Sequence, residues 1–568
     1  MKKKILACAV ALCLVLAVIP AFAADGNVTD AQGFKEALEA GGEVVLGGSF
    51  EIDSRLGITI TQPVTLDLNG YTVTETYGAN NNFVIAIKEG GSLTINDSAG
   101  EGAIIAEHED YGYGIQLYSG ATLIVNGGTI ETTQEAIDIR TSASNVKIEI
   151  NGGKVVSTED GALSVRGSSN VAVDIKGGEM VSGGRTGMYV SGDNEDSIII
   201  NMTGGSLTQT ADGGLSGAIQ AYKGATINIS GTASITSNSS YGVQVQENVV
   251  LNVSGGSIAA VDSRRDAISV EGQGEVNVTG GEISSTTNSA IGASENAVVN
   301  VSGGKLTGEE GRDAIAKEDE AVVAVTGGSF SSDVSEYVPE DMTVDTDDEG
   351  NFVVYVEVTF SDNDEATDND KVVKVAVGDK IDASEAPAFT MDGYTLNGWM
   401  KSDGTAWDME NDAVSEKITL VPVWVLNAPE VTLTADKTTV TEGESITLTA
   451  QAVHGAAGAT FTYAWYKDGV LIEGQTGATL TVTESGSYSV KVSAADGSLT
   501  SAQIESEAVT CTVNPVTEEP GEEPGEDNPG LEDPDNGGDA GVLLLAAVLA
   551  AAVAGLAGVA FYFKKRKA

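Results

Sequence analysis

The sequence predicts an all-β protein: a right-handed parallel β-helix of about 11 coils, then a small β-rich repeat module and a β-sandwich, with one C-terminal transmembrane helix. Three observations lead to this fold class. A glycine-centred motif recurs at a nearly constant interval through the middle of the chain. Glycine is abundant at 70 residues and aromatic residues are scarce at 5%, which favours strands and tight turns. Both ends of the chain carry apolar runs flanked by basic residues.

The N-terminal residues have the pattern of a secretion signal. Three lysines at positions 2–4 precede an apolar run over residues 5–20, and the Ala-Phe-Ala sequence at 21–23 has the form of a cleavage site. We therefore expect residues 1–23 to be a signal peptide and the rest of the chain to be exported.

The repeated motif is a Gly-Gly turn followed by an apolar residue, as in NGGTI, TGGSL and SGGSI. Nine copies, one of which has lost its second glycine, follow one another at intervals of 23 to 27 residues. A motif with this period indicates stacked supersecondary units. The first glycines of the copies are Gly127, Gly152, Gly177, Gly204, Gly231, Gly255, Gly280, Gly303 and Gly327.

Each unit contains three short strand patterns. Apolar residues alternate before the glycines, as at Val146, Ile148 and Ile150, and again in a further strand, as at Ile137 and Ile139. Alternation turns one set of side chains inward. Three such strands bury that set only if successive coils stack, about 4.8 Å apart, into three parallel sheets.

An outward position three residues before the first glycine provides a test of this register. It is polar in seven units, and five of these residues are asparagine. Amides at one coil spacing can bond up the stack, so we expect a hydrogen-bonded ladder. The positions are Glu149, Asp174, Asn201, Asn228, Asn252, Asn277 and Asn300.

The first coil is expected to be covered by a helix. Residues 31–40 predict a short amphipathic helix, and residues 44–46 a strand. A helix at this end would protect strand edges that otherwise recruit other chains. The arrangement resembles the N-terminal end of pectin-lyase-like right-handed β-helix proteins, and we assign residues 24–335 to such a domain with its cap.

Residues 336–357 predict a hairpin that connects this domain to the next module. The spacing of Asp345, Asp347 and Glu349 also suggests a calcium loop. The twelfth position of that loop is Val356, which cannot supply the required bidentate carboxylate. A hairpin turn is therefore the preferred interpretation.

Residues 358–426 resemble the Listeria-Bacteroides repeat, the internalin-type B repeat. The matching segments are VTF from Val358, GYTLNGW from Gly393, GTAWD from Gly404 and ITLVPVW from Ile418. The resemblance implies a small β-rich module of surface proteins. In so small a module we expect three tryptophans in the core, namely Trp399, Trp407 and Trp424.

Residues 428–515 resemble an immunoglobulin-like sandwich. Trp465 and Tyr488 stand where such domains place a core tryptophan and a tyrosine corner. The disulfide of antibody domains is absent, because Val490 occupies the position two residues after the tyrosine. Cys511 is then expected to be a small buried apolar residue.

The C-terminal part predicts a stalk and an anchor. Residues 516–540 are acidic and rich in Pro and Gly, which indicates an extended chain. Residues 541–563 are apolar over a length that can cross a bilayer, and the basic residues 564–568 would stay in the cytoplasm. A buried core helix is the alternative. The layout resembles Gram-positive wall anchors without an LPxTG motif, and predicts a single-pass cell-surface protein of a Gram-positive bacterium with an extracellular N-terminal region.

The net charge limits the classes of partner, and the cysteine content limits the covalent cross-links. The formal net charge is -53, which repels nucleic acid phosphates and leaves the C-terminal helix as the expected membrane contact. Cys8 and Cys13 lie in the signal peptide, so no intramolecular disulfide can form. The expected partner is an extracellular glycan or protein.

Pectin-lyase-like proteins include polysaccharide lyases and hydrolases, so the resemblance raises the question of chemistry on the coils. Two outward-facing groups are candidates, but neither offers three converging carboxylates, and the chain has only two histidines, His108 and His454. We therefore predict no catalytic residue, no metal site and no cofactor. The candidate ligand-binding strip consists of Tyr118, Asp138, Arg140, Arg166, Gln220 and Tyr222. The second group, in one loop, consists of Asp262, Arg264, Arg265 and Asp266.

The function that this reading favours is a non-catalytic surface adhesin or display protein that binds glycans or host or matrix proteins through the β-helix. A cell-attached polysaccharide lyase or glycoside hydrolase is the alternative, and a surface-layer component is a third possibility. The step from fold to binding is an analogy, since many functions share one fold.

Overall fold

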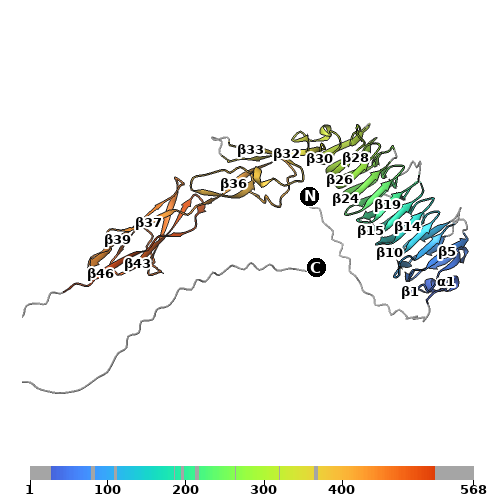
Figure 1. The fold of residues 1–568 in the computed structure, drawn as a ribbon, viewed down its shortest axis with the longest axis horizontal. Coiled ribbons are helices and arrows are strands. Elements are labelled where there is room, and N and C mark those ends of the chain that lie inside the picture. Colours follow the sequence, from blue (N-terminus) through green and yellow to red (C-terminus); the bar gives the residue numbers. More distant parts are fainter. Residues whose placement is uncertain are drawn as a thin grey trace, which may run out of the picture.

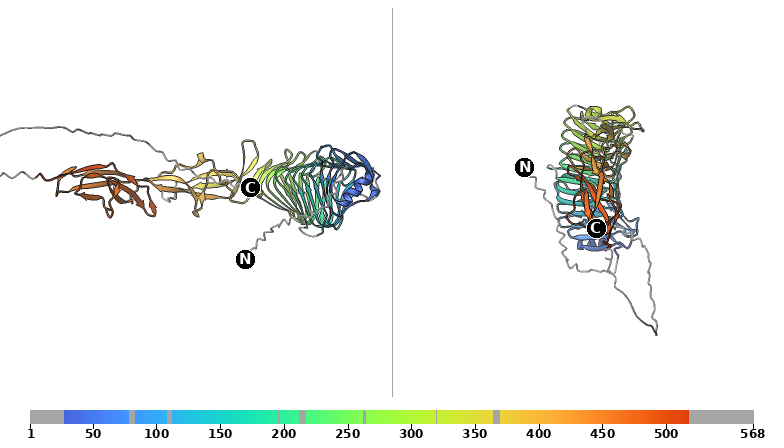
Figure 2. Two further views of the ribbon diagram at one scale, coloured as in Figure 1. Left: turned by 90° about the horizontal axis from the view of Figure 1, so that it is seen from below. Right: turned by 90° about the vertical axis from the view of Figure 1, so that its left-hand side faces the viewer.

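The computed structural model describes residues 27–77, 83–107, 112–184, 186–193, 197–211, 217–261, 264–318, 320–363 and 369–517. The predicted signal peptide and almost all of the predicted stalk lie outside these residues. Three bodies follow one another along the described chain (Figures 1 and 2): a stack of coils, a small β module and a β-sandwich.

The coils form a β-solenoid of about 11 turns with three parallel sheets, which confirms the predicted architecture. The first sheet contains β1 (Gly42–Val45), β4 (Pro63–Asp67), β7 (Ser92–Asn96), β10 (Thr122–Val125), β13 (Ser144–Ile150), the second part of β15 (Leu163–Ile175), β18 (Ile198–Met202), β21 (Ala225–Ile229), and the first parts of β24 (Val250–Ala260), β26 (Glu275–Ser285), β28 (Val298–Thr307) and β30 (Val322–Phe330).

The second sheet follows across the glycine turns. It contains β2 (Phe50–Asp53), β5 (Thr72–Tyr77), β8 (Ala103–Ala106), β11 (Thr129–Thr132), β14 (Lys154–Ser157), β16 (Glu179–Ser182), β19 (Ser206–Gln209), β22 (Ser234–Ser237) and the second parts of β24, β26, β28 and β30. The third sheet contains β3 (Ile58–Ile60), β6 (Phe83–Ile87), β9 (Tyr113–Leu117), β12 (Ile137–Ile139), the first part of β15, β17 (Met188–Gly192), β20 (Ile219–Lys223), β23 (Val243–Val245), β25 (Ile268–Val270), β27 (Ile291–Ala293) and β29 (Ile315–Lys317).

The apolar alternation places equivalent side chains above one another inside the coil. Ile148 pairs with Val173 in the next strand, and Val173 pairs with Ile200. All three are fully buried and belong to one core that continues through the solenoid. The inward positions predicted from the alternation are therefore confirmed.

The second glycine of the motif is required by close approach of two coils. Gly153 has φ of 77°, in the left-handed region that glycine tolerates. A Cβ atom there would lie 2.6 Å from the carbonyl oxygen of Gly128 in the preceding coil. The motif is thus both a turn and a stacking contact.

The predicted amide ladder is present over six of its seven positions. Each asparagine donates from Nδ2 to the side-chain oxygen of the preceding coil, from Asn201 to Asp174 (2.8 Å), Asn228 to Asn201 (2.8 Å), Asn252 to Asn228 (2.9 Å), Asn277 to Asn252 (3.1 Å) and Asn300 to Asn277 (2.9 Å). Glu149 instead forms ion pairs with Lys147 and Lys176. A second ladder that the sequence analysis missed runs from Asn151 through Asn126 to Asn96.

Replacing Asn252 by alanine removes two ladder bonds, one to Asn228 and one from Asn277. We expect the free energy of unfolding to fall by about 1–3 kcal/mol, measured by urea denaturation followed by circular dichroism. Asn300 makes one ladder bond, because Ala324 faces it in the next coil. Asn300→Ala should therefore cost about half as much, and equal losses would contradict a contribution from the stacked amides.

The N-terminal cap is the predicted helix, α1 (Ala31–Ala40). Asp30 caps it by accepting a hydrogen bond from the Gly33 N–H, and Phe34 and Leu38 are fully buried against the first coil. A short 3-10 helix, η1 (Ser54–Leu56), follows β2.

The solenoid continues into the small module through a hairpin. After η2 (Ser335–Tyr337), β31 (Met342–Thr346) pairs with β32 (Phe352–Phe360), and β32 also pairs with the last solenoid strand, β30. Asp347 Oδ1 accepts hydrogen bonds from the Glu349 and Asn351 N–H groups at 2.9 and 2.8 Å. The carboxylate considered for calcium therefore stabilises the turn.

The rest of the small module contains β33 (Lys371–Ala376), η3 (Ala383–Glu385), β34 (Tyr394–Lys401), β35 (Ala406–Trp407) and β36 (Ile418–Leu426). Trp399 and Trp407 are buried in its core with Phe360. Trp424 is only partly buried, so its prediction as a core residue is wrong. It pairs with Leu396 between two antiparallel strands, outside the cluster formed by the other two tryptophans.

The sandwich has two sheets. One contains β37 (Glu430–Ala435), β39 (Ile446–Val453) and β42 (Thr479–Val482); the other contains β38 (Thr439–Thr441), β46 (Val509–Asn514), β43 (Gly486–Asp496), β40 (Thr460–Lys467) and β41 (Val470–Leu471), with β44 (Leu499–Thr500) and β45 (Ile504–Glu505) paired to β43. Trp465 is fully buried and donates from Nε1 to the Gly477 carbonyl oxygen at 2.9 Å. Cys511 is a buried free thiol in the same core, as expected.

The predicted fold class requires one correction. Among the described residues, no helix is long and apolar enough to cross a membrane. The C-terminal transmembrane helix expected at residues 541–563, with the basic tail 564–568, lies outside those residues and is not supported. The prediction rested on the apolar run alone. An apolar run shows only that a segment is long enough to cross a bilayer, not that it forms a helix there.

Candidate functional site

The outer face of the third sheet carries a continuous row of side chains, one from each strand. The residue that lies between the two inward positions of each strand pairs with the equivalent residue of the next strand. Because the alternation turns these residues outward, the row runs along the solenoid axis. From the N-terminal end its members are Thr59, Ala86, Gln116, Asp138, Ser164, Tyr189, Gln220, Gln244, Ser269, Gly292 and Ala316.

An ionic cluster occupies the N-terminal half of this face. Arg166 Nη1 lies 2.8 Å from Glu135 Oε1 and 3.9 Å from Asp138 Oδ1. Gln116 donates from Nε2 to Asp138 Oδ2 at 3.0 Å. Glu135 and Asp138 are only 7% and 8% exposed, so their charges are compensated mainly within the cluster.

The pKa of a third carboxyl group, that of Asp160, is also affected by the charges of this cluster. Burial, together with the nearby charge of Glu135, raises the pKa of Asp160 to about 6. Burial also raises the pKa of Asp138. Glu135, Asp138 and Asp160 therefore act together on the charge of Arg166.

This arrangement predicts a pH-dependent effect of Asp160→Asn. A raised pKa means that the carboxylate form of Asp160 destabilises the folded state above pH 6, and that this effect disappears as the pH falls toward the usual pKa near 4. The variant should therefore be more stable than the unmodified protein at pH 8, by on the order of 1 kcal/mol, and equal to it near pH 4. Urea midpoints at the two pH values check this, and a gain that is the same at both would contradict it.

Aromatic and amide side chains occupy the middle of the face. The rings of Tyr189 and Tyr222 lie 5.7 Å apart, and Tyr222 is 38% exposed. Gln220 Nε2 donates to Gln244 Oε1 at 3.1 Å and to the Tyr222 hydroxyl at 3.3 Å. The guanidinium of Arg166 lies 5.4 Å from the Tyr189 ring centroid and joins this group to the ionic cluster.

Tyr118 and Arg140 form the edge of the face. Lys88 Nζ lies 2.9 Å from the centroid of the Tyr118 ring, and the Arg140 guanidinium lies 5.1 Å from it. Arg140 Nη1 also donates to the Tyr118 hydroxyl at 3.4 Å. The ring of Tyr118 is therefore engaged by cations of its own chain.

The structure places all six residues of the candidate strip on this one face, in three contacting groups. Their role in ligand binding stays a prediction. Tyr189 was not among the predicted site residues, although it could have been found as the residue between the paired apolar positions of its unit. It also missed Glu135 and Asp160, which come from turns and follow no period.

The second group predicted from sequence lies farther along the solenoid. Arg265 donates to the Tyr241 hydroxyl at 3.0 Å, and Asp266 Oδ1 accepts from the Ser289 N–H at 3.2 Å. Asp262 lies outside the described residues, as does His108. In the part of the chain that the structure describes, no group of three or more His, Cys, Asp or Glu side chains could hold a metal ion.

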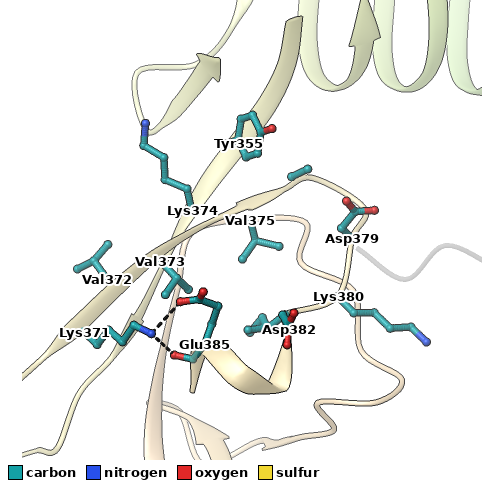
Figure 3. A pocket seen from close by; sticks show the side chains of 12 residues that line it. Tyr355, Lys371, Val372, Val373, Lys374, Val375, Asp379, Lys380, Asp382 and Glu385 are labelled. Atoms are coloured by element: carbon teal, nitrogen blue, oxygen red, sulfur yellow. Dashed lines mark hydrogen bonds and ion pairs between the residues drawn. The ribbon is translucent and has the colours of Figure 1, made fainter. Parts of the chain in front are cut away.

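A cavity of about 480 Å³ lies beside strand β33 in the small module (Figure 3). Most of its charged groups are bonded within the module. Lys371 Nζ lies 2.7 Å from Glu385 Oε2, and Lys380 Nζ donates to the Glu410 carbonyl oxygen at 2.6 Å. Asp382 accepts hydrogen bonds from Ser384. Most of the charged groups that line this cavity are therefore bonded within the module.

Comparison with known proteins identifies one part of the chain. Residues 357–422 match the Listeria-Bacteroides repeat domain, so the small module from β32 to β36 is such a repeat domain. No curated protein matches the chain. The chain thus combines a long β-solenoid with a Listeria-Bacteroides repeat domain and a two-sheet sandwich.

Proposed function

We propose that the protein is a non-catalytic cell-surface adhesin or display protein that binds an extracellular glycan through the outer face of the third sheet. The observation that carries the proposal is the continuity of Arg166, Tyr189, Tyr222 and Gln220 on that face. Aromatic rings supply apolar area to a sugar ring, while amides and carboxylates supply donors and acceptors for its hydroxyl groups.

The elongated arrangement supports a role in display. The repeat domain and the sandwich continue the chain away from the solenoid (Figure 2). Their junction is stabilised by a hydrogen bond from the Tyr394 hydroxyl to Asp496 Oδ2 at 2.6 Å and by packing of Leu426 against Ala494. A fixed junction would hold the binding face at a distance from the C-terminal end.

The finer assignments belong to this proposal. We propose a pectin-lyase-like type for the solenoid and an immunoglobulin-like type for the sandwich, in a surface protein of a Gram-positive bacterium. The sandwich is supported by the Tyr488 hydroxyl, which donates to the Glu484 carbonyl oxygen four residues upstream at 2.9 Å. The predicted signal-peptide pattern of residues 1–23 supports export.

A glycoside hydrolase is the second candidate function, and the three carboxyl groups around Arg166 favour it. Hydrolysis needs a protonated carboxylic acid and a second carboxylate. Asp160, with a pKa of about 6, has the character of the acid. Binding without turnover is preferred because Glu135 and Asp138 are buried and already bonded to Arg166 and Gln116.

One experiment separates the two functions. The purified full chain is applied to a glycan and matrix-protein array, and the glycans that it retains are then incubated with it while reducing ends and ultraviolet-absorbing unsaturated products are measured. Retention without product supports the proposal. Product formation establishes the enzyme, and retention of matrix proteins alone would overturn glycan binding.

A further inference from the structure

A second hollow lies on the third-sheet face, beyond the aromatic group. Its volume is about 530 Å³, which is within the range of small-ligand sites. It spans strands β25, β27 and β29 and the turns that precede them, and it begins about three strand spacings, or about 14 Å, beyond Tyr189.

The hollow exists because the outward row ends in small residues. Gln220 and Gln244 are followed by Ser269, Gly292 and Ala316. A Cβ atom at Gly292 would lie 2.3 Å from Asp266 Oδ2, so the absence of a side chain there makes room for this carboxylate. The floor of the hollow therefore consists of small residues, and its walls are polar.

One wall has an aromatic ring held in a fixed position. The Arg265 guanidinium lies 5.2 Å from the Tyr241 ring centroid and donates to its hydroxyl group. Across the floor, Glu271 accepts hydrogen bonds from Gln246 Nε2 (2.9 Å) and Ser269 Oγ (3.1 Å). These contacts fix the two walls before a ligand arrives, which lowers the entropic cost of binding.

The charges lining the hollow select against an anionic ligand. Four carboxyl groups and two guanidinium groups face it, and the carboxyl groups exceed the cations by two: Asp266, Glu271, Asp313 and Glu318 against Arg265 and Arg312. Arg265 is engaged with Tyr241, and Arg312 lies 3.9 Å from Glu309 outside the lining. The field inside therefore favours a ligand that carries positive charge.

We propose that this hollow binds an amino sugar unit of the glycan, with the protonated amine among the carboxylates and the pyranose ring against Tyr241. The inference rests on the proposed function and deepens it, because it specifies the glycan as one with unacetylated amino groups. A chain that lies along the solenoid axis would contact the aromatic group and the hollow together.

The test uses the full chain with β-1,4-linked glucosamine oligomers, their N-acetylated counterparts and oligogalacturonate, measured by titration calorimetry at pH 7. We expect the glucosamine oligomers to bind at least tenfold more tightly than the N-acetylated ones, and oligogalacturonate not to bind. Ala316→Leu fills the hollow and should abolish this preference. Ala86→Leu, in the same outward row at the other end of the solenoid, should retain it.

Asp266→Asn gives a second measurement that does not depend on filling space. It should weaken binding of the glucosamine oligomers and leave binding of the N-acetylated oligomers unchanged. Equal affinity for the two oligomers, or equal losses in Ala316→Leu and Ala86→Leu, would overturn the inference. If N-acetylated oligomers bind through Tyr189 without any preference for the amine, the proposed function survives and this inference fails; if no glycan on the array binds, both fail.

Discussion

Replacing Gly205 by alanine should lower the free energy of unfolding of the solenoid by about 3 kcal/mol. Gly205 has φ of 72°, and a Cβ atom there would lie 2.7 Å from the carbonyl oxygen of Gly177 in the preceding coil. The substitution combines the cost of a left-handed alanine, about 1–2 kcal/mol, with the cost of overpacking a stacked backbone, about 1–3 kcal/mol. The backbone of the coil below cannot rotate away as a flexible side chain would.

Gly100 offers a matched control in the same domain. Its φ is 79°, but a Cβ atom there meets nothing within 4 Å. Gly100→Ala should therefore cost only about 1 kcal/mol. Both values come from urea denaturation followed by circular dichroism. Equal costs at the two positions would show that the turn does not contact the coil beneath it, and would contradict the stacked architecture.

Replacing Tyr189 by alanine should weaken glycan binding about 30-fold or more, as expected for an aromatic residue at the centre of an interface. The Tyr189 ring contacts both the Arg166 guanidinium and the Tyr222 ring. Its loss therefore removes a stacking surface for the sugar and a contact that positions these two side chains. The affinity for the glycan that the array retains is measured by titration calorimetry.

Two further variants separate stacking from other effects of Tyr189→Ala. Tyr189→Phe keeps the ring and should bind within about threefold of the unmodified protein, because only the hydroxyl is lost. Tyr466 is a tyrosine of the sandwich whose ring also lies near a cation, Lys491, and Tyr466→Ala should leave the affinity unchanged. An unchanged affinity in Tyr189→Ala would place the ligand elsewhere on the molecule.

Much of the solenoid could be predicted from the sequence because its coils repeat. A period of about two dozen residues fixes which side chains lie above one another, and alternation within each strand fixes which of them point inward. The prediction of the ladder from Asp174 to Asn300 depended on both the period and the alternation, and the structure confirms this ladder. The capping helix could be found for a different reason, since its amphipathic spacing is a local signal.

The candidate site was predictable only where it follows the period. Asp138 and Gln220 lie in the outward row, and their neighbours follow from the coil spacing. Glu135 and Asp160 lie in turns, whose path depends on the local hydrogen bonds of each coil. Tyr222 lies two residues after Gln220 and therefore on the same face, so alternation was enough to include it in the predicted strip.

The sequence by itself therefore determined the stacking of the coils, the inward and outward faces and the presence of a Listeria-Bacteroides repeat. The tertiary structure alone decided that Glu135 and Asp138 pair with Arg166, that Trp424 lies outside the core of its module, and that the outward row ends in a hollow over Gly292. The reason is physical: periodic backbone pairing transmits position from one coil to the next, whereas turns and bulges are set by contacts that exist only in the folded chain.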